Sequence, residues 1–242
     1  TNTALFTQSY CTFQGYSQPN YLEFYSGFNQ GVTNNLVPSN HPFTTDNLGR
    51  QLMDAGKTFV TYSEDLPYAG YNGPSWGAYE RKHNPVTNWM GTGINQVPDT
   101  VNQPFTSYPA WDFNQLPTIS FVVPNNINNM HDGNYPVNFQ LADAWLQANM
   151  DSYIQWTLNN NSLFILTFDE GNFTNRITTL FHGPMVQGGQ YADTINHFIV
   201  LRTLEDMYGL GHAGSAAYVQ PITWCWKTTS VNASTDFEKL SL

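Results

Sequence analysis

The sequence predicts an α/β sandwich with a mostly parallel sheet, and three observations lead to this class. Short apolar or β-branched runs alternate with stretches of helical periodicity, which is the pattern of strands and helices in such folds. One run, Leu163–Phe168, is apolar on both faces, as a central parallel strand should be. The length of 242 residues, 40% of them hydrophobic, suits one domain with a sizeable core.

The predicted elements follow from these runs. Strands are expected at Ala4–Phe13, Thr58–Ser63, Thr118–Val123, Leu163–Phe168 and Thr178–Phe181. Helices are expected at Asn47–Ala55, Leu141–Leu158 and Asn196–Tyr208, the last followed by Gly209 as a C-cap. Between them, Tyr68–Pro117 is a long stretch rich in Gly, Pro, Asn and Trp. Loops of that length in α/β enzymes usually build the functional site.

The charge balance excludes two classes of partner. The chain carries 8 Lys and Arg against 18 Asp and Glu, for a formal net charge of −10. Such a surface repels phosphate backbones and anionic lipid, so we expect neither a nucleic-acid partner nor membrane-surface binding. No apolar run reaches the roughly 18 residues that a membrane span needs.

The composition favours the secretory pathway. Lysine is scarce, Asn, Thr, Ser and Tyr are abundant, and N-glycosylation sequons begin at Asn160, Asn172 and Asn232. The only cysteines are Cys11 and Cys225, which leaves two alternatives open: one bridge between the chain ends, or two separate buried thiols. The start at Thr1, without a methionine or an apolar leader, is interpreted as a processed or truncated product.

Chemistry-bearing residues follow three of the predicted strands. Ser17 comes after the first strand, His131 after the third, and Asp169-Glu170 after the fourth. Ligands of open α/β sheets bind outside the carboxyl ends of the strands, so these side chains should converge at one edge. A hydroxyl, an imidazole and paired carboxylates predict a metal-assisted hydrolase or transferase. The alternative is that each is an ordinary turn residue.

Seven blocks resemble, in order, the phosphoesterase family of acid phosphatases and bacterial phospholipases C. They are Ser17–Leu22, Tyr62–Pro67, Tyr79–Pro85, Phe121–Asn125, His131–Gly133, Thr167–Glu170 and Ile195–Gly209. The resemblance reaches about Trp226, so we expect one phosphoesterase-like domain over residues 1–226 and a polar tail over 227–242. The most similar branch is that of the acid phosphatases, which implies a secreted, extracellular or vacuolar protein.

The resemblance also implies an alkaline phosphatase-like sandwich, with helices flanking a mostly parallel sheet. That family opens with a strand ending in Glu-Asn, which supplies further metal ligands, and no Glu-Asn pair occurs in this chain. We therefore expect the first strand to be missing from the chain. Two explanations compete: an incomplete sequence, or a degenerate member that binds metal poorly. The first is favoured because the other functional residues are retained.

Residue roles carry over from the matching blocks. Ser17 matches the nucleophile, and Asp169 and Glu170 match paired acidic ligands that, with Ser17, would hold one divalent metal ion of unidentified kind. His131 and His83 match imidazoles that stabilise the transferring group or protonate the leaving alkoxide.

Four further residues are expected to bind substrate. Asn20 would donate to a phosphoryl oxygen, and Arg81 and Lys82 are candidate countercharges that could instead balance neighbouring carboxylates. His197 stands where a helix begins, and a capping or packing role is its alternative.

The resulting hypothesis is a metal-dependent acid phosphatase that hydrolyses small phosphomonoesters through a phosphoserine intermediate. A homo-oligomer is one assembly that it could form. One alternative is a phosphodiesterase or phospholipase C. Another is a degenerate, non-catalytic binding or structural protein, to which the aromatic residues of the long loop would contribute: Tyr68, Tyr71, Trp76, Tyr79 and Trp89.

Overall fold

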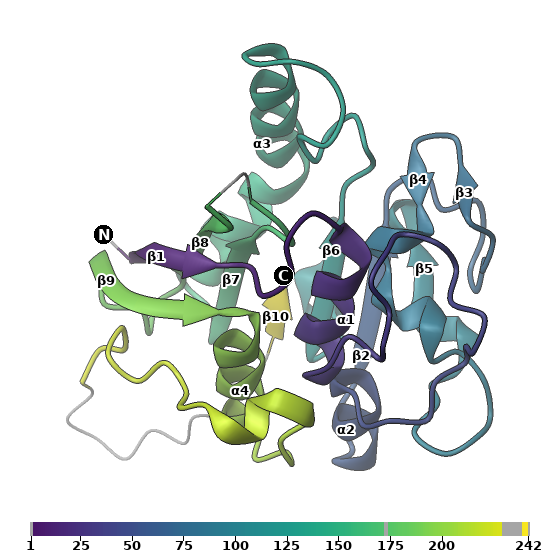
Figure 1. Cartoon of the computed structure of the whole chain (residues 1–242). Coiled ribbons are helices and arrows are strands. Elements are labelled where there is room, and N and C mark those ends of the chain that lie inside the picture. The colour runs from purple at the N-terminus through teal and green to yellow at the C-terminus, as the bar shows by residue number, and fades with distance from the viewer. Residues whose placement is uncertain (1, 172–173, 229–238, 242) are drawn as a thin grey trace.

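The centre of the molecule is an eight-stranded sheet in the order β5-β2-β6-β10-β7-β8-β1-β9, seen in a computed structural model that describes residues 2–171, 174–228 and 239–241 (Figure 1). The strands, from one edge to the other, are Asn102–Pro104, Phe59–Ser63, Ile119–Val123, Lys239–Ser241, Ser162–Thr167, Arg176–His182, Thr3–Tyr10 and Gly189–Asn196. Only β8 runs antiparallel to its neighbours among these described strands. The mostly parallel sheet predicted from the sequence is therefore confirmed.

The described residues also form four α-helices: α1 (Ser17–Ser26), α2 (Leu48–Asp54), α3 (Val137–Thr157) and α4 (His197–Met207). The long loop contains a small hairpin of β3 (Ser75–Trp76) and β4 (Tyr79–Glu80). Short 3-10 helices occupy Arg81–His83, Pro85–Asn88, Asp99–Val101, Phe105–Ser107, Phe113–Gln115 and Gly214–Tyr218. The five predicted strands and three predicted helices are all present. The first strand ends at Tyr10 rather than Phe13, and α3 begins four residues earlier than expected. The prediction did not include α1, β3, β4, β5, β9 or β10.

Helices pack on both faces of the sheet, because successive residues of the central strands face opposite sides. Leu163 and Ile165 of β7 join a large hydrophobic cluster with residues of α1, α2 and α4. Phe164 and Leu166, which alternate with them, join a second cluster with residues of α3. The sheet is thus buried on both sides, as the apolar run in β7 indicated.

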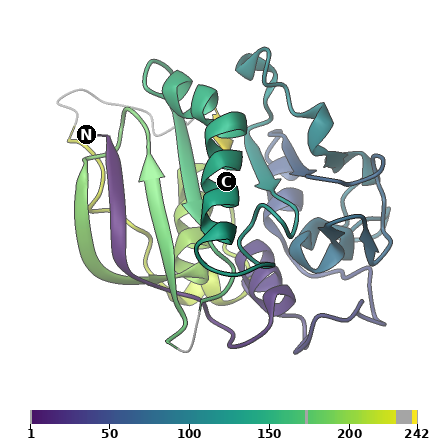
Figure 2. The ribbon, with the colours of Figure 1, turned by 90° about the horizontal axis from the view of Figure 1, so that it is seen from above.

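The amino-terminal strand β1 lies next to the edge strand of the sheet. β1 pairs with β8 on one side and β9 on the other, and Figure 2 shows it, in purple, between these two green strands. Ala4 and Phe6 of β1 are buried in the larger cluster. This packing fixes the end of β1, and hence the loop that leads from it to α1.

The structure also bears on the cysteines, the C-terminal tail and the glycosylation sequons. Cys11 and Cys225 are both buried free thiols, which is the second of the two alternatives above. No described helix has the length and apolar character to cross a membrane. The residues of β10 belong to the region expected to be a polar tail. Asn160 is half-buried and donates to the Trp156 carbonyl, whereas Asn172 and Asn232 lie outside the described residues.

Candidate functional site

A cavity of about 660 Å³ lies where β6 and β7 end. The parallel strands β1, β6 and β7 run in one direction, so the segments that follow them meet at this edge of the sheet. Six residues that the sequence singled out line the cavity: Asn20, His83, His131, Asp169, Glu170 and His197. The predicted convergence of strand ends is therefore present.

Ser17 is the first residue of α1 and is fully buried beside the cavity. The chain reaches it through Gly15, whose positive φ of 85° turns the backbone, and through Tyr16 in an extended conformation. The Ser17 hydroxyl donates a hydrogen bond to Glu170 Oε1 over 2.7 Å. This contact ties the start of α1 to the residues that follow β7.

Asp169 stands in a low-dielectric position next to Glu170. Burial, and then the negative charge of Glu170, raise the pKa of the Asp169 carboxyl to about 6, and the Ser17 hydroxyl acts in the opposite direction. Its Oδ2 atom is buried and has no hydrogen-bond partner within the described part of the chain. A buried carboxylate oxygen without a partner is costly unless a cation or a proton compensates it.

His197 is the first residue of α4 and supports the Asp169 backbone. Its Nε2–H donates to the Asp169 carbonyl oxygen over 2.8 Å, and its ring packs against Phe24 of α1 at 5.7 Å. Burial lowers the pKa of His197 to about 4, so the ring is neutral near pH 5 and above. The cap of α4 is Asn196, whose side chain accepts from the Ile199 N–H. His197 therefore holds Asp169 in place, in addition to lining the cavity.

Two imidazoles face each other across the cavity wall. The rings of His83 and His131 lie 5.5 Å apart, and Lys82 Nζ donates to His131 Nε2 over 3.0 Å. With Nε2 accepting, the His131 Nδ1–H donates to Asp132 Oδ1 over 2.8 Å, which fixes one tautomer. Burial, followed by the positive charge of Lys82, lowers the pKa of His83 to about 3.

Asn20 braces the loop before Ser17. Its Oδ1 accepts from the N–H groups of Thr12 and Phe13, and its Nδ2 donates to the carbonyls of Phe13 and Tyr16. These bonds use both ends of the amide, so in this conformation Asn20 fixes the approach to α1.

Arg81 lies outside the cavity. Its side chain is buried under the long loop, where Nε donates to Asn72 Oδ1 and Nη2 to the Thr87 carbonyl. Burial lowers its pKa to about 10. Of the two candidate countercharges, Lys82 is thus the one that reaches an imidazole of the cavity.

Sequence reasoning did not single out Tyr21 and Asn129, which also line the cavity. The Tyr21 ring packs against His83 at 5.5 Å, and Asn129 Nδ2 lies 3.5 Å from His83 Nδ1. Tyr21 directly follows Asn20 in the motif that contains Ser17, which was the available signal. Asn129 precedes His131 by two residues in a polar turn and carries no signal of its own.

The residues of the site fit a divalent cation in part. Ser17 and Glu170 are in contact, Asp169 is adjacent, and its Oδ2 is free to bind; carboxylate and hydroxyl oxygens are ligands that hard divalent cations accept. Among the described residues, no cluster of three or more His, Cys, Asp and Glu side chains forms a metal site. The protein ligands for a cation would therefore be the carboxylates of Asp169 and Glu170 and the hydroxyl of Ser17.

Comparisons with known proteins agree with the family resemblance of the sequence. The model of the phosphoesterase family matches residues 1–211. Over 213 residues, 87% of this chain, the sequence is 42% identical to a phosphatidylinositol-3-phosphatase of Mycobacterium tuberculosis, of which the match covers 68%. It is 30% identical to a phosphate-repressible acid phosphatase of Penicillium chrysogenum and 28% identical to an acid phosphatase of Aspergillus niger, over 82% of this chain in each case. The chain spans half the length of these fungal relatives. The chain belongs to the phosphoesterase family.

Proposed function

We propose that this protein is a metal-dependent acid phosphatase that hydrolyses phosphomonoesters, with Ser17 as the nucleophile. The observation that carries the proposal is the 2.7 Å hydrogen bond from the Ser17 hydroxyl to Glu170, at the start of α1 and beside the cavity. Relatives named as phosphatases support a phosphoric ester hydrolase.

Ser17 is activated by its surroundings. A neutral hydroxyl is a weak nucleophile, and the Glu170 carboxylate is placed to accept its proton. The positive end of the α1 dipole lies at Ser17 and favours a phosphoryl group there, although the Gln18 N–H is bonded to Asn35 Oδ1 and Pro19 has no N–H to donate. In-line attack by Ser17 Oγ on phosphorus forms a phosphoserine and releases the alcohol, and water then hydrolyses the phosphoserine to phosphate and free Ser17.

A divalent cation would be held by Asp169, Glu170 and Ser17, and when bound it would stabilise the alkoxide and neutralise phosphoryl charge. The unpartnered Oδ2 of Asp169 supports this assignment. His197 contributes by holding the Asp169 backbone in position.

The leaving alcohol needs a proton, and His131 is the best placed donor. It lines the cavity, its Nδ1–H is held by Asp132, and a proton taken up on Nε2, in place of the bond from Lys82, would be transferred to the alcohol oxygen. His83 has its pKa lowered to about 3, so it is neutral at working pH and can only offer or accept a hydrogen bond. It would orient the phosphoryl group rather than protonate the alcohol.

We also infer the finer features of the molecule. An alkaline phosphatase-like sandwich lacking one strand is supported by helices on both faces of the sheet and by the short β10 in its middle. A secreted or vacuolar location with N-glycans is supported by the three sequons. A homo-oligomer stays a prediction from the sequence.

The test is steady-state hydrolysis of a chromogenic phosphomonoester and of the matching diester, with divalent cation added. We expect turnover of the monoester and a loss of roughly 10³-fold or more in Ser17→Ala. Ser162→Ala is the matched control, because Ser162 is equally buried and its hydroxyl has no partner in the described structure. Faster turnover of the diester would favour the phosphodiesterase alternative. If neither substrate were turned over, the non-catalytic alternative would be favoured.

A further inference from the structure

The block Tyr62–Pro67 is part of the family resemblance, but the proposed chemistry gives it no role. It contains the end of β2 and Glu64, the residue that follows this strand. β2 pairs in parallel with β6, and Ser63 is level with Val123, where β6 ends (Figure 1). The Glu64 N–H continues the ladder by donating to the Val123 carbonyl over 2.9 Å. The chain that leaves β2 therefore lies beside the chain that leaves β6.

The segment after β6 carries His131 outside any helix or strand. Residues 124–136 form only turns and bends between β6 and α3, and we call residues 125–132 the His131 turn. His131 lines the cavity and is the proposed proton donor. A general acid must be held within hydrogen-bond reach of the oxygen that it protonates. The position of this turn therefore bears directly on the proposed chemistry.

Glu64 holds the start of the His131 turn. Its Oε2 accepts from the Asn125 N–H over 2.9 Å, and Asn128 Nδ2 lies 3.0 Å from both carboxylate oxygens. The neighbouring Asp65 accepts at Oδ2 from Asn125 Nδ2 over 2.8 Å. Hydrogen bonds to a carboxylate are roughly twice as strong as those between neutral groups. These bonds anchor the turn to the end of β2.

The turn transmits this restraint to His131. Asn125 Oδ1 accepts from the Asn128 N–H over 3.1 Å, and the Asn125 carbonyl accepts from the Asn129 N–H over 3.0 Å. Asn129 Oδ1 in turn accepts from the His131 N–H over 2.9 Å. A continuous series of hydrogen bonds therefore joins the Glu64 carboxylate to the His131 backbone.

Glu64 can act on the reaction only through this turn. Asn128, Asn129 and His131 line the cavity, and Glu64 does not appear among its described lining residues. The Glu64 side chain is half-buried, and it forms no ion pair within the described part of the chain. Its carboxylate is therefore committed to the amides of the His131 turn.

We propose that Glu64 is a positioning residue for the phosphatase reaction, which fixes the His131 turn and so keeps His131 within reach of the leaving alcohol. The proposal rests on the proposed function, in which His131 protonates that alcohol. Loss of the carboxylate would leave the imidazole chemically intact but free to move away from the alcohol oxygen.

The test variant is Glu64→Gln, which keeps the size of the side chain. It removes the charge and places an NH2 group against the donors of Asn125 and Asn128. Glu80→Gln is the control, because it makes the same replacement at a half-buried residue whose side chain forms no hydrogen bond among the described residues. Both variants are examined by kcat/KM for an alkyl phosphate and for p-nitrophenyl phosphate, and by amide hydrogen exchange. Glu64→Gln is also combined with His131→Gln.

We expect Glu64→Gln to lower kcat/KM roughly tenfold or more for the alkyl phosphate and roughly threefold at most for p-nitrophenyl phosphate, because p-nitrophenolate leaves without protonation. In the His131→Gln background, which already lacks the donor, Glu64→Gln should cause no further loss with the alkyl phosphate. Amides of the His131 turn should exchange roughly tenfold faster in Glu64→Gln than in Glu80→Gln, with equal exchange in β7 as evidence that both are folded.

Equal exchange of the His131 turn in Glu64→Gln and Glu80→Gln would overturn the proposal. Faster exchange with the same loss for both phosphates would also overturn it, as would a loss that adds to that of His131→Gln, because Glu64 would then support the fold rather than His131. A uniform loss in His131→Gln itself would contradict the proposed role of His131, whereas the exchange rates test the hold of Glu64 on the turn without any turnover.

Discussion

Ser17 Oγ lies 2.7 Å from Glu170 Oε1, although 153 positions separate the two residues in the chain. Ser17 is placed by the turn between β1 and α1, and Glu170 by the end of β7. The contact therefore depends on β1 and β7 running in the same direction, with β8 antiparallel between them. A hydroxyl at a helix start, held by a carboxylate, is the arrangement that the proposed chemistry requires.

Replacing the acceptor should abolish this activation without unfolding the protein. In Glu170→Gln the side chain keeps its size but loses the charge that accepts the Ser17 proton. We expect kcat for a phosphomonoester to fall roughly 10²-fold or more. Asp143→Asn, on an exposed position of α3, is the charge-matched control and should retain full activity. Equal rates for the two variants would exclude Glu170 from the reaction.

The role of His131 can be separated from a structural one by varying the leaving group. His131→Gln removes a proton donor but keeps a polar side chain of similar reach. We expect the loss of kcat/KM to be large for an alkyl phosphate and small for p-nitrophenyl phosphate, because p-nitrophenolate leaves without protonation. A uniform loss across both substrates would indicate that His131 only shapes the cavity.

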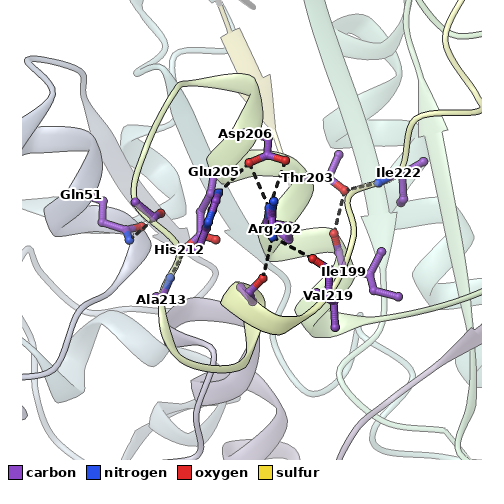
Figure 3. A network of polar contacts seen from close by, with 12 residues as sticks. Gln51, Ile199, Arg202, Thr203, Glu205, Asp206, His212, Ala213, Val219 and Ile222 are labelled. Carbon is purple, nitrogen blue, oxygen red and sulfur yellow. Dashed lines mark hydrogen bonds and ion pairs between the residues drawn. The ribbon is translucent and has the colours of Figure 1, made fainter.

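Glu205 should make the fold less stable as the pH rises. Figure 3 shows it in the network between α4 and the following loop, where its Oε1 accepts from the Ala213 N–H over 2.7 Å. Burial raises the pKa of this carboxyl from 4.5 to about 7. The folded state thus binds the proton more tightly than the unfolded state, so the stabilisation is complete below pH 4.5 and is lost as the pH rises towards 7.

Urea unfolding at pH 5 and pH 8 measures this effect. The shift of the pKa from 4.5 to about 7 corresponds to roughly 3 kcal/mol. Glu205→Gln keeps an acceptor for the Ala213 N–H and has no proton to lose, so its stability should change less between the two pH values. An unchanged pH dependence in Glu205→Gln would show that other groups cause it.

Gly27 should be the glycine least tolerant of substitution at the end of α1. Its φ is 69°, and a Cβ atom there would lie 2.0 Å from the Ala213 carbonyl oxygen. Gly31 also has a positive φ, of 77°, but a Cβ atom at Gly31 would meet nothing within 4 Å. We expect Gly31→Ala to cost about 1 kcal/mol and Gly27→Ala about 3 kcal/mol or more, measured by denaturant unfolding. Similar costs would mean that the Ala213 backbone moves away easily.

The strands of the core were predictable because a buried parallel strand is a short run of apolar residues with little ambiguity. β2, β6 and β7 differ from the predicted ranges by one residue at one or both ends. Two elements gave weaker signals. α1 begins Ser-Gln-Pro-Asn, which is typical of a turn, although proline is tolerated in a first helical turn. β9 is an edge strand of mixed polarity and lacks an alternating pattern.

The convergence of Ser17, Asp169 and Glu170 was predictable from strand ends alone, since parallel strands bring their carboxyl ends together. The contacts that Arg81 and His197 make within the fold were not predictable in this way. The burial of Arg81 depends on the Asn72 and Thr87 acceptors of the long loop, which no sequence period reveals. The bond from His197 to the Asp169 carbonyl depends on how α4 packs against the end of β7.

The most direct measurement of the central claim is to trap the phosphorylated enzyme. The protein is mixed with a phosphomonoester and divalent cation, quenched in acid during turnover, digested, and its peptides are weighed by mass spectrometry. A covalent phosphate on Ser17, absent in Ser17→Ala and in protein without substrate, is the predicted result. Turnover of the phosphomonoester with no phosphate on Ser17, and with Ser17→Ala as active as the natural sequence, would contradict it.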